Sequence, residues 1–125
     1  MDIYECGEKL KALRIGDMVA KIPIIQGGMG VGISRSKLAG AVAAEGGIGI
    51  ISTAQIGYDE DDFEKDQAGC NLLAIRKHIK RAKEIACGNG LVEIGRASWR
   101  DRVFGYVLVG GGGGGLMVGG GGGGG

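Results

Sequence analysis

The stretch KIPIIQGGMGVG, residues 21–32, decides the fold, because a short apolar run leads directly into a glycine-rich loop. The continuous apolar character of residues 21–26 predicts a strand buried on both faces, as in parallel sheets, with Pro23 tolerated near its start. In parallel α/β folds, ligands bind where such a strand ends and its loop begins. Residues 27–32 are therefore a candidate ligand loop.

Spacing alone leaves this loop open between a structural turn and a ligand site. A dinucleotide-binding GxGxxG motif is not formed, because Ile33 or Arg35 stands where the third glycine should be. No Lys-Ser or Lys-Thr pair follows to complete a phosphate-binding P-loop. Glycine backbone can still closely approach a flat ring or a phosphate, and Met29 would offer the ring a soft apolar surface.

A strand–helix–strand unit is predicted around this loop. Ser34 is the expected N-cap of the helix, and the glycines at 46–47 are its expected end. Residues 48–52, IGIIS, then form a second buried strand. The core-facing residues of the helix are predicted from their helical spacing: Leu38, Ala41 and Val42.

A second helix is predicted over residues 70–86, after an acidic, exposed loop at residues 58–66. Residues 88–90, GNG, provide its expected C-cap and turn. The only histidine, His78, is expected on the surface, without a metal-binding partner and without a nearby Ser or Cys to form a nucleophile–base pair. One apolar stripe is predicted to face the core: Leu72, Ile75, Ile79, Ala82 and Ala86.

Composition excludes several function classes. The formal net charge is +1, and no aromatic residues interleave with the basic face of the second helix, so nucleic-acid binding is not expected. No apolar run approaches the ~20 residues that a membrane helix needs. The three cysteines are widely spaced and odd in number, which favours free thiols in a reducing cytoplasm.

Three segments together carry a resemblance to a known family. They are IGD at 15–17, PIIQGGMG at 23–30 and AEGGIGIIS at 44–52, and the basic helix NLLAIRKHIKRAKEIACGNG follows at 71–90. Over residues 8–92 the chain resembles the nitronate monooxygenase family, formerly called 2-nitropropane dioxygenase. That family includes the FMN-type enoyl-acyl-carrier-protein reductases.

The resemblance implies a (β/α)8 TIM barrel that binds FMN at its carboxyl-terminal face. Gly27, Gly28 and Met29 match the flavin-contacting loop, and Ser52 matches a position lining the same face. The substrate of the parent enzyme would be a small-molecule nitronate or an enoyl thioester. No catalytic residue can be assigned, because the family's histidine-bearing segment has no match and His78 lies mid-helix.

The predicted organisation is a truncated barrel piece of two βα units at residues 1–92, followed by a disordered glycine-rich tail at 93–125. A barrel needs ~250 residues. The string EIGRASWRDRV at 93–103 resembles a translated sequencing adapter, and the glycine blocks that follow fit the interpretation of an artefactual tail. A natural low-complexity tail is the alternative. In either case residues 104–109 could form a short strand-like stretch.

The sequence therefore predicts a fragment of an FMN-dependent oxidoreductase of the nitronate monooxygenase type, inactive alone and without retained flavin. Two alternatives stay open. One is a fragment of an FMN-dependent enoyl-acyl-carrier-protein reductase. The other is a small non-catalytic module that binds a phosphate or a flavin.

Overall fold

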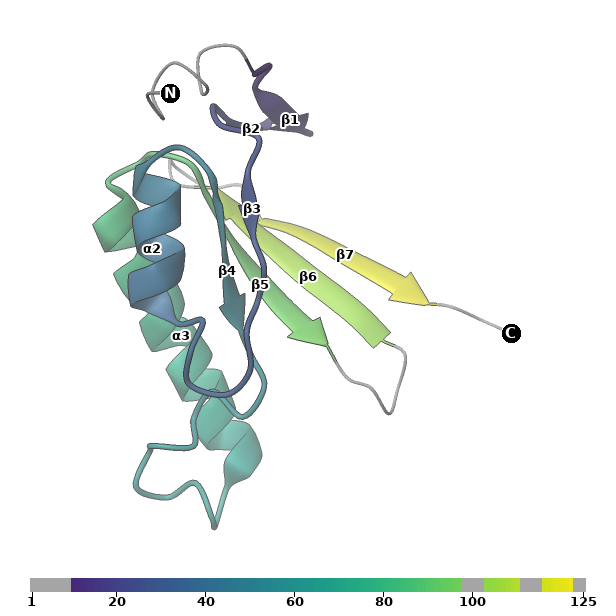
Figure 1. Ribbon diagram of the computed structural model, residues 1–125. Coiled ribbons are helices and arrows are strands. Elements are labelled where there is room, and N and C mark those ends of the chain that lie inside the picture. The colour runs from purple at the N-terminus through teal and green to yellow at the C-terminus, as the bar shows by residue number, and fades with distance from the viewer. Residues whose placement is uncertain (1–9, 98–102, 111–115, 123–125) are drawn as a thin grey trace.

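The computed structural model describes residues 10–97, 103–110 and 116–122 (Figure 1). The elements in chain order are β1 Leu13–Ile15, β2 Met18–Ala20, β3 Ile25–Gln26, α2 Ser36–Ala44, β4 Ile48–Ser52, α3 Gln67–Ala86, β5 Leu91–Ala97, β6 Val103–Gly110 and β7 Leu116–Gly122.

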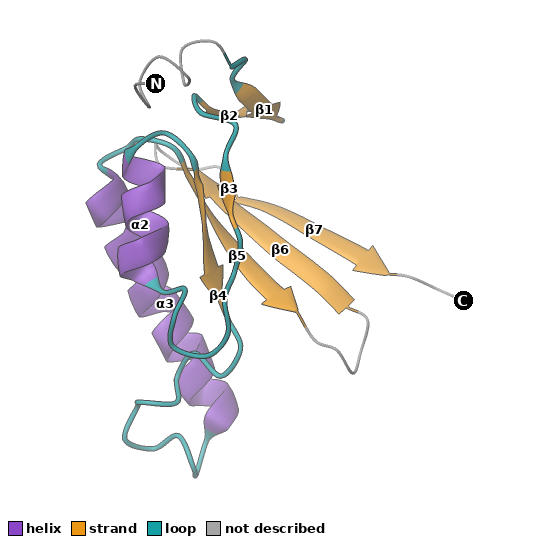
Figure 2. Cartoon of the chain, viewed as in Figure 1, coloured by secondary structure: helices purple, strands orange, loops and turns teal. Residues whose placement is uncertain are grey.

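The centre of the fold is a βαβαβ unit. Strands β3, β4 and β5 are parallel neighbours, joined through α2 and α3, and both helices lie against one face of the sheet (Figure 2). The register places Ile25 beside Ile48 and Ile48 beside Leu91. The two predicted βα units are therefore present, and the predicted strand at residues 48–52 is confirmed.

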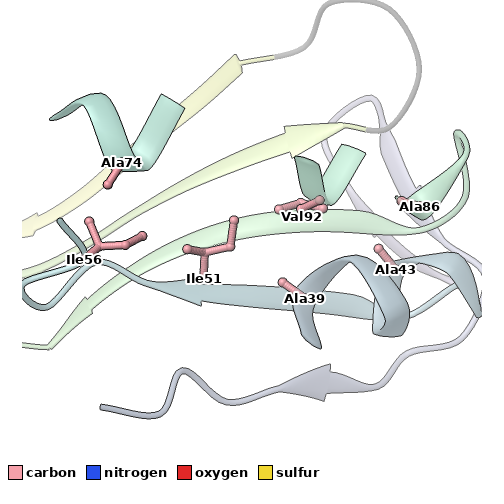
Figure 3. Packing of buried hydrophobic residues seen from close by; sticks show 8 residues of the cluster. Ala39, Ala43, Ile51, Ile56, Ala74, Ala86 and Val92 are labelled. Carbon is pink, nitrogen blue, oxygen red and sulfur yellow. The ribbon is translucent and has the colours of Figure 1, made fainter. Parts of the chain in front are cut away.

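The helix-side core is built largely from small residues (Figure 3). Helix α2 lies so close to the sheet that a Cβ on Gly49 would overlap the Ala39 carbonyl. On its other side, a Cβ on Gly40 would lie 2.8 Å from Ile85 Cβ. The buried cluster consists of Ala39, Ala43, Ile51, Ile56, Ala74, Ala82, Ala86 and Val92.

The predicted core face of α2 is wrong. Its buried residues are Ser36, Ala39, Gly40 and Ala43. The larger predicted side chains Leu38 and Val42 are half-buried, and Ala41 is exposed. Close approach of the helix to both the sheet and α3 admits only small side chains at the contact, so size and not apolarity selects the buried face.

Most of the predicted stripe of α3 is confirmed. Ala82 and Ala86 are fully buried, and Ile75 and Ile79 pack against the core. Leu72 is 52% exposed, and the contact in this part of the helix comes from Cys70 and Ala74 instead.

The ends of α3 also differ from expectation. The helix begins at Gln67, where the Asp66 carboxylate caps it by accepting from the Gly69 N–H at 2.9 Å. It ends with Cys87 in the left-handed conformation, at φ 50°, in place of the expected glycine.

The prediction that the 21–26 strand is buried on both faces is wrong. Only Ile25 and Gln26 are in strand β3, and Ile24 and Ile25 are 56% and 52% exposed. The cause is position, because β3 is the outermost strand of the described sheet and pairs only with β4.

A small hairpin covers the other face of the sheet at its amino end. Strands β1 and β2 pair antiparallel, with Leu13 beside Ala20. Met18 and Ala20 form a second buried cluster with Ile48 and Leu91. The hairpin therefore covers the amino end of the parallel strands.

The expected disorder after residue 92 is wrong for much of that segment. Strand β5 continues to Ala97, and β6 and β7 extend the sheet as antiparallel strands. Ladder hydrogen bonds use only the backbone, so an open strand edge can pair with glycine-rich chain as well. The strand-like stretch expected at 104–109 is part of β6, and the predicted boundary at 92 falls inside β5. The rest of the tail lies outside the described residues.

Candidate functional site

The glycine loop of residues 27–33 lies at the carboxyl end of β3, beside the end of β4. Gly27, Gly28 and Met29 are exposed, and Ser52 is half-buried. Side chains alternate between the faces of a strand, so Ser52 and Ile50 share the face of Ile48, opposite the helices.

The structure brings the predicted site residues together. A Cβ on Gly28 would lie 3.2 Å from Ile50 Cγ2 and 3.9 Å from Ser52 Cβ, so the loop backbone passes directly over the end of β4. Gly27 faces open space, with no atom within 4 Å of its Cβ position. Met29 follows with its side chain 45% exposed.

The sequence predicts Ser34 as the N-cap of α2, but this residue instead holds the far end of the glycine loop. Its buried hydroxyl accepts from the Met29 N–H at 2.9 Å, and its carbonyl accepts from the Ser52 N–H at 2.9 Å. Helix α2 instead has Arg35 at its N-cap, without a side-chain capping bond. The hydroxyl is already engaged by the loop, so it does not serve the helix.

Gln26 is the residue that sequence reasoning missed. Its Oε1 accepts from the Ile50 N–H at 3.1 Å. Its Nε2 donates to Ser34 Oγ at 3.0 Å and also to the Gly27 carbonyl. A polar residue closing an apolar strand directly before a glycine loop was the available signal.

The end of the loop favours glycine at position 32. This residue has φ +79°, and a Cβ there would lie 3.0 Å from the Tyr58 hydroxyl. The loop is therefore fitted against the segment that follows β4 as well as against β4 itself.

A second cluster lies between the start of α2 and α3. Arg35 donates to both oxygens of Asp59, at 2.8 and 3.1 Å, and to the Ile56 carbonyl at 2.9 Å. Its guanidinium lies 4.7 Å from the centre of the Tyr58 ring. The hydrogen bond from Arg35 lowers the pKa of Asp59.

His78 belongs to this cluster, which corrects the expectation that no serine lies near it. Its Nδ1 lies 3.0 Å from Ser36 Oγ. Burial, with a smaller contribution from Arg35, lowers the pKa of His78, so the neutral ring is favoured. Ser36 is only 5% exposed, and a substrate could not reach its hydroxyl without moving the helices. The pair therefore joins α2 to α3.

The open pocket beside His78 has a volume of about 440 Å³. Its charged side chains pair with one another or with neighbours, as Lys77 does with Glu60 at 2.7 Å and Arg81 with Glu84 at 3.3 Å. We therefore interpret this cluster as a set of structural polar contacts that hold α2 against α3. The pocket is lined by Arg35, Ser36, Asp59, Glu60, Lys77, His78 and Arg81.

The glycine loop fits the ring of a flavin better than its phosphate. It offers exposed backbone at Gly27 and Gly28 and a thioether at Met29, whereas the cation nearest in sequence, Arg35, is committed to Asp59. Uncharged donors and a soft apolar surface suit a neutral aromatic ring. Within the described residues, no three His, Cys, Asp or Glu side chains gather to hold a metal, and neither helix is long and apolar enough to cross a membrane.

Comparison with known proteins agrees with this architecture. The model of the nitronate monooxygenase family matches residues 12–86, from the β1–β2 hairpin to the end of α3. No curated protein and no solved structure matched the chain significantly. Because the family match includes the glycine loop and covers more than half of the chain, this protein belongs to the nitronate monooxygenase family.

Proposed function

We propose that this chain supplies the first two βα units of an FMN-dependent oxidoreductase that acts on nitronates. The observation that carries the proposal is the exposed backbone of Gly27 and Gly28 at the carboxyl end of parallel strands, with Ser52 beside it. Met29 would lie against the ring. FMN, when bound, supplies the electron transfer, and these residues bind and orient its ring.

The nitronate substrate follows from the family whose model matches, rather than from a pocket in this chain. A complete (β/α)8 barrel is part of the proposal. The covered amino end of β3, β4 and β5 and the exposed glycine loop at the carboxyl end of β3 support it, since barrel enzymes bind their ligands at the carboxyl end. A cytoplasmic location agrees with the free thiols of Cys70 and Cys87.

We further propose that the chain alone does not catalyse the oxidation of a nitronate. The described sheet holds three parallel strands, whereas a barrel surrounds its ligand with eight. A flavin on this loop would stay open to water on its other sides. We therefore expect weak contact with the ring and no yellow flavin retained through gel filtration.

The test is a titration of the ¹⁵N-labelled chain with riboflavin, FMN and inorganic phosphate in separate series. We expect riboflavin and FMN to shift the amide resonances of Gly27, Gly28, Met29 and Ser52 to a similar extent, and phosphate to leave them unchanged. Shifts confined to other residues would contradict the site. Tight retention of FMN, or oxidation of a small alkyl nitronate by the purified chain, would contradict the inactivity.

A further inference from the structure

We propose that Gln26 and Ser34 are positioning residues, which together form a latch that presents the N–H groups of Gly27 and Gly28 to the flavin ring. The part of this inference that concerns the ring rests on the proposed function. The latch itself is a property of the chain and can be tested without any ligand.

The first half of the latch lies where the β3–β4 ladder stops. The Ile48 N–H donates to the Ile24 carbonyl at 2.8 Å, as in a regular ladder. The N–H of Ile50, two residues further along β4, donates to Oε1 of Gln26 at 3.1 Å. The side chain of Gln26 thus contacts β4 at the point where the backbone leaves β3 and enters the glycine loop.

The second half is the fully buried hydroxyl of Ser34. It accepts from the Met29 N–H at 2.9 Å and from Gln26 Nε2 at 3.0 Å, and it lies 3.5 Å from the Gly27 carbonyl. A buried oxygen with several partners is costly to remove, because its donors are left unsatisfied. Ser34 therefore fixes the loop on both sides of Gly28.

The consequence falls on the two glycines between these anchors. Within the part of the chain that the structure describes, neither the Gly27 nor the Gly28 N–H has an acceptor, although the carbonyl of Gly27 and the N–H of Met29 are both engaged. Both glycines are exposed. Donors that are already fixed before binding need not be ordered when the ligand binds, so less binding free energy is lost. The latch would strengthen binding in this way.

The experiment compares Ser34→Ala and Gln26→Leu with a matched control, Ser36→Ala, in the full chain. Ser36 is also buried and also loses a side-chain hydrogen bond, that to His78, but it does not touch the loop. Amide hydrogen exchange is measured at Met29 and Ile50, and riboflavin affinity is measured by amide shifts. Ser34→Thr, which keeps the hydroxyl, serves as the rescue variant.

We expect Ser34→Ala to speed exchange at Met29 and to weaken riboflavin binding by about ten-fold each, the effect of one lost buried hydrogen bond. Gln26→Leu should speed amide exchange at Ile50 and should likewise weaken riboflavin binding. Ser36→Ala should lower the melting temperature without either effect, and Ser34→Thr should restore both. If Ser34→Ala does not fold, Gln26→Leu and Ser34→Thr provide the comparison.

Two results would overturn the latch. One is unchanged Met29 exchange in Ser34→Ala. The other is equal loss of riboflavin binding in Ser34→Ala and Ser36→Ala, which would mark a general loss of stability. If the unmodified chain gives no riboflavin shifts, the proposed flavin site fails, while the exchange rates still decide whether Gln26 and Ser34 hold the loop.

Discussion

Gly49 sets the distance between the sheet and α2. A Cβ at this position would overlap the Ala39 carbonyl, which belongs to the helix backbone and cannot move aside as a flexible side chain could. Strand β4 therefore depends on a missing side chain for its contact with the helix. Gly27 is the opposite case, since a Cβ there would meet nothing within 4 Å.

These two glycines give a matched stability test. We expect Gly49→Ala to lower the free energy of unfolding by about 3 kcal/mol, because the helix must shift to admit the methyl group. Gly27→Ala should change it by no more than about 0.5 kcal/mol. Urea unfolding followed by circular dichroism measures both variants. Equal effects would contradict the close packing of β4 against α2.

Cys87 offers a stabilising substitution. It ends α3 in the left-handed conformation at φ 50°, which strains any residue with a Cβ. Cys87→Gly should raise the free energy of unfolding by about 1 kcal/mol, even though it gives up the contact of Sγ with the Glu84 carbonyl. Cys87→Ala keeps the strain and should show no gain. Thermal melting of the two variants distinguishes them.

Single residues were also where sequence reasoning failed. Ser34 has the right residue type and place for a helix N-cap, but its hydroxyl is used by the loop. Gln26 carried no motif, although it contacts β4, Ser34 and the loop at once. Periodicity reports which side of an element is apolar, and it contains no information on which polar partner a side chain will find.

At the scale of elements, the contact between α2 and α3 combines close packing with a side-chain hydrogen bond. Gly40 admits Ile85 of α3, and His78 of α3 reaches Ser36 at the start of α2. The existence of both helices followed from the sequence, because long apolar stripes and glycine ends are strong signals. The face that α2 buries did not follow, since it depends on how near α3 comes.

The contact between His78 and Ser36 should make the stability of the fold depend on pH. Burial and Arg35 lower the pKa of His78 below its ordinary 6.5, so the unfolded chain binds the proton more readily. Nearby Asp59 and Glu60 oppose this shift and do not reverse it. Stability should therefore fall as the pH drops from about 7 to about 5.

His78→Gln should flatten that decline, because an amide can keep the bond to Ser36 without titrating. Chemical unfolding across the pH range measures the slope. Lys80→Gln, an exposed change on the same helix, is the control and should keep the slope of the unmodified chain. An unchanged slope in His78→Gln would remove His78 as the cause.

For the whole molecule, the order of elements from β3 through α3 was predictable, because each βα unit is signalled locally, whereas the β1–β2 hairpin was not predicted. What was not predictable is the setting of β3, which is apolar like a central strand yet lies at the border of the described sheet. The pairing of β7 with β6 was equally hidden, although residues 104–109 of β6 were expected to be strand-like. Glycine-rich chain has few side chains to signal a strand, and its backbone still completes a ladder.

The exposed border of β3 should promote self-association. Ile25 is 52% exposed, and no other strand of the described sheet pairs with the outer side of β3, which favours edge-to-edge contact. We expect Ile25→Lys to shift the sedimentation profile toward monomer. Leu72→Lys removes an equally exposed apolar side chain, also 52%, from a helix and should leave the profile unchanged. Equal effects would point to general hydrophobic association.

The change of direction at β5 has a consequence for any barrel built on this chain. Strand β5 runs parallel to β4, but its other edge is occupied by β6 running antiparallel, from Leu91 beside Gly110 to Ala97 beside Phe104. A barrel would require a fourth parallel strand in that place. A separate polypeptide carrying later barrel strands would therefore have to strip β6 from the whole length of β5 before it could dock. Strand β6 thus competes with any such polypeptide for the edge of β5. Deleting β6 would expose that edge and allow a separate chain to pair with it.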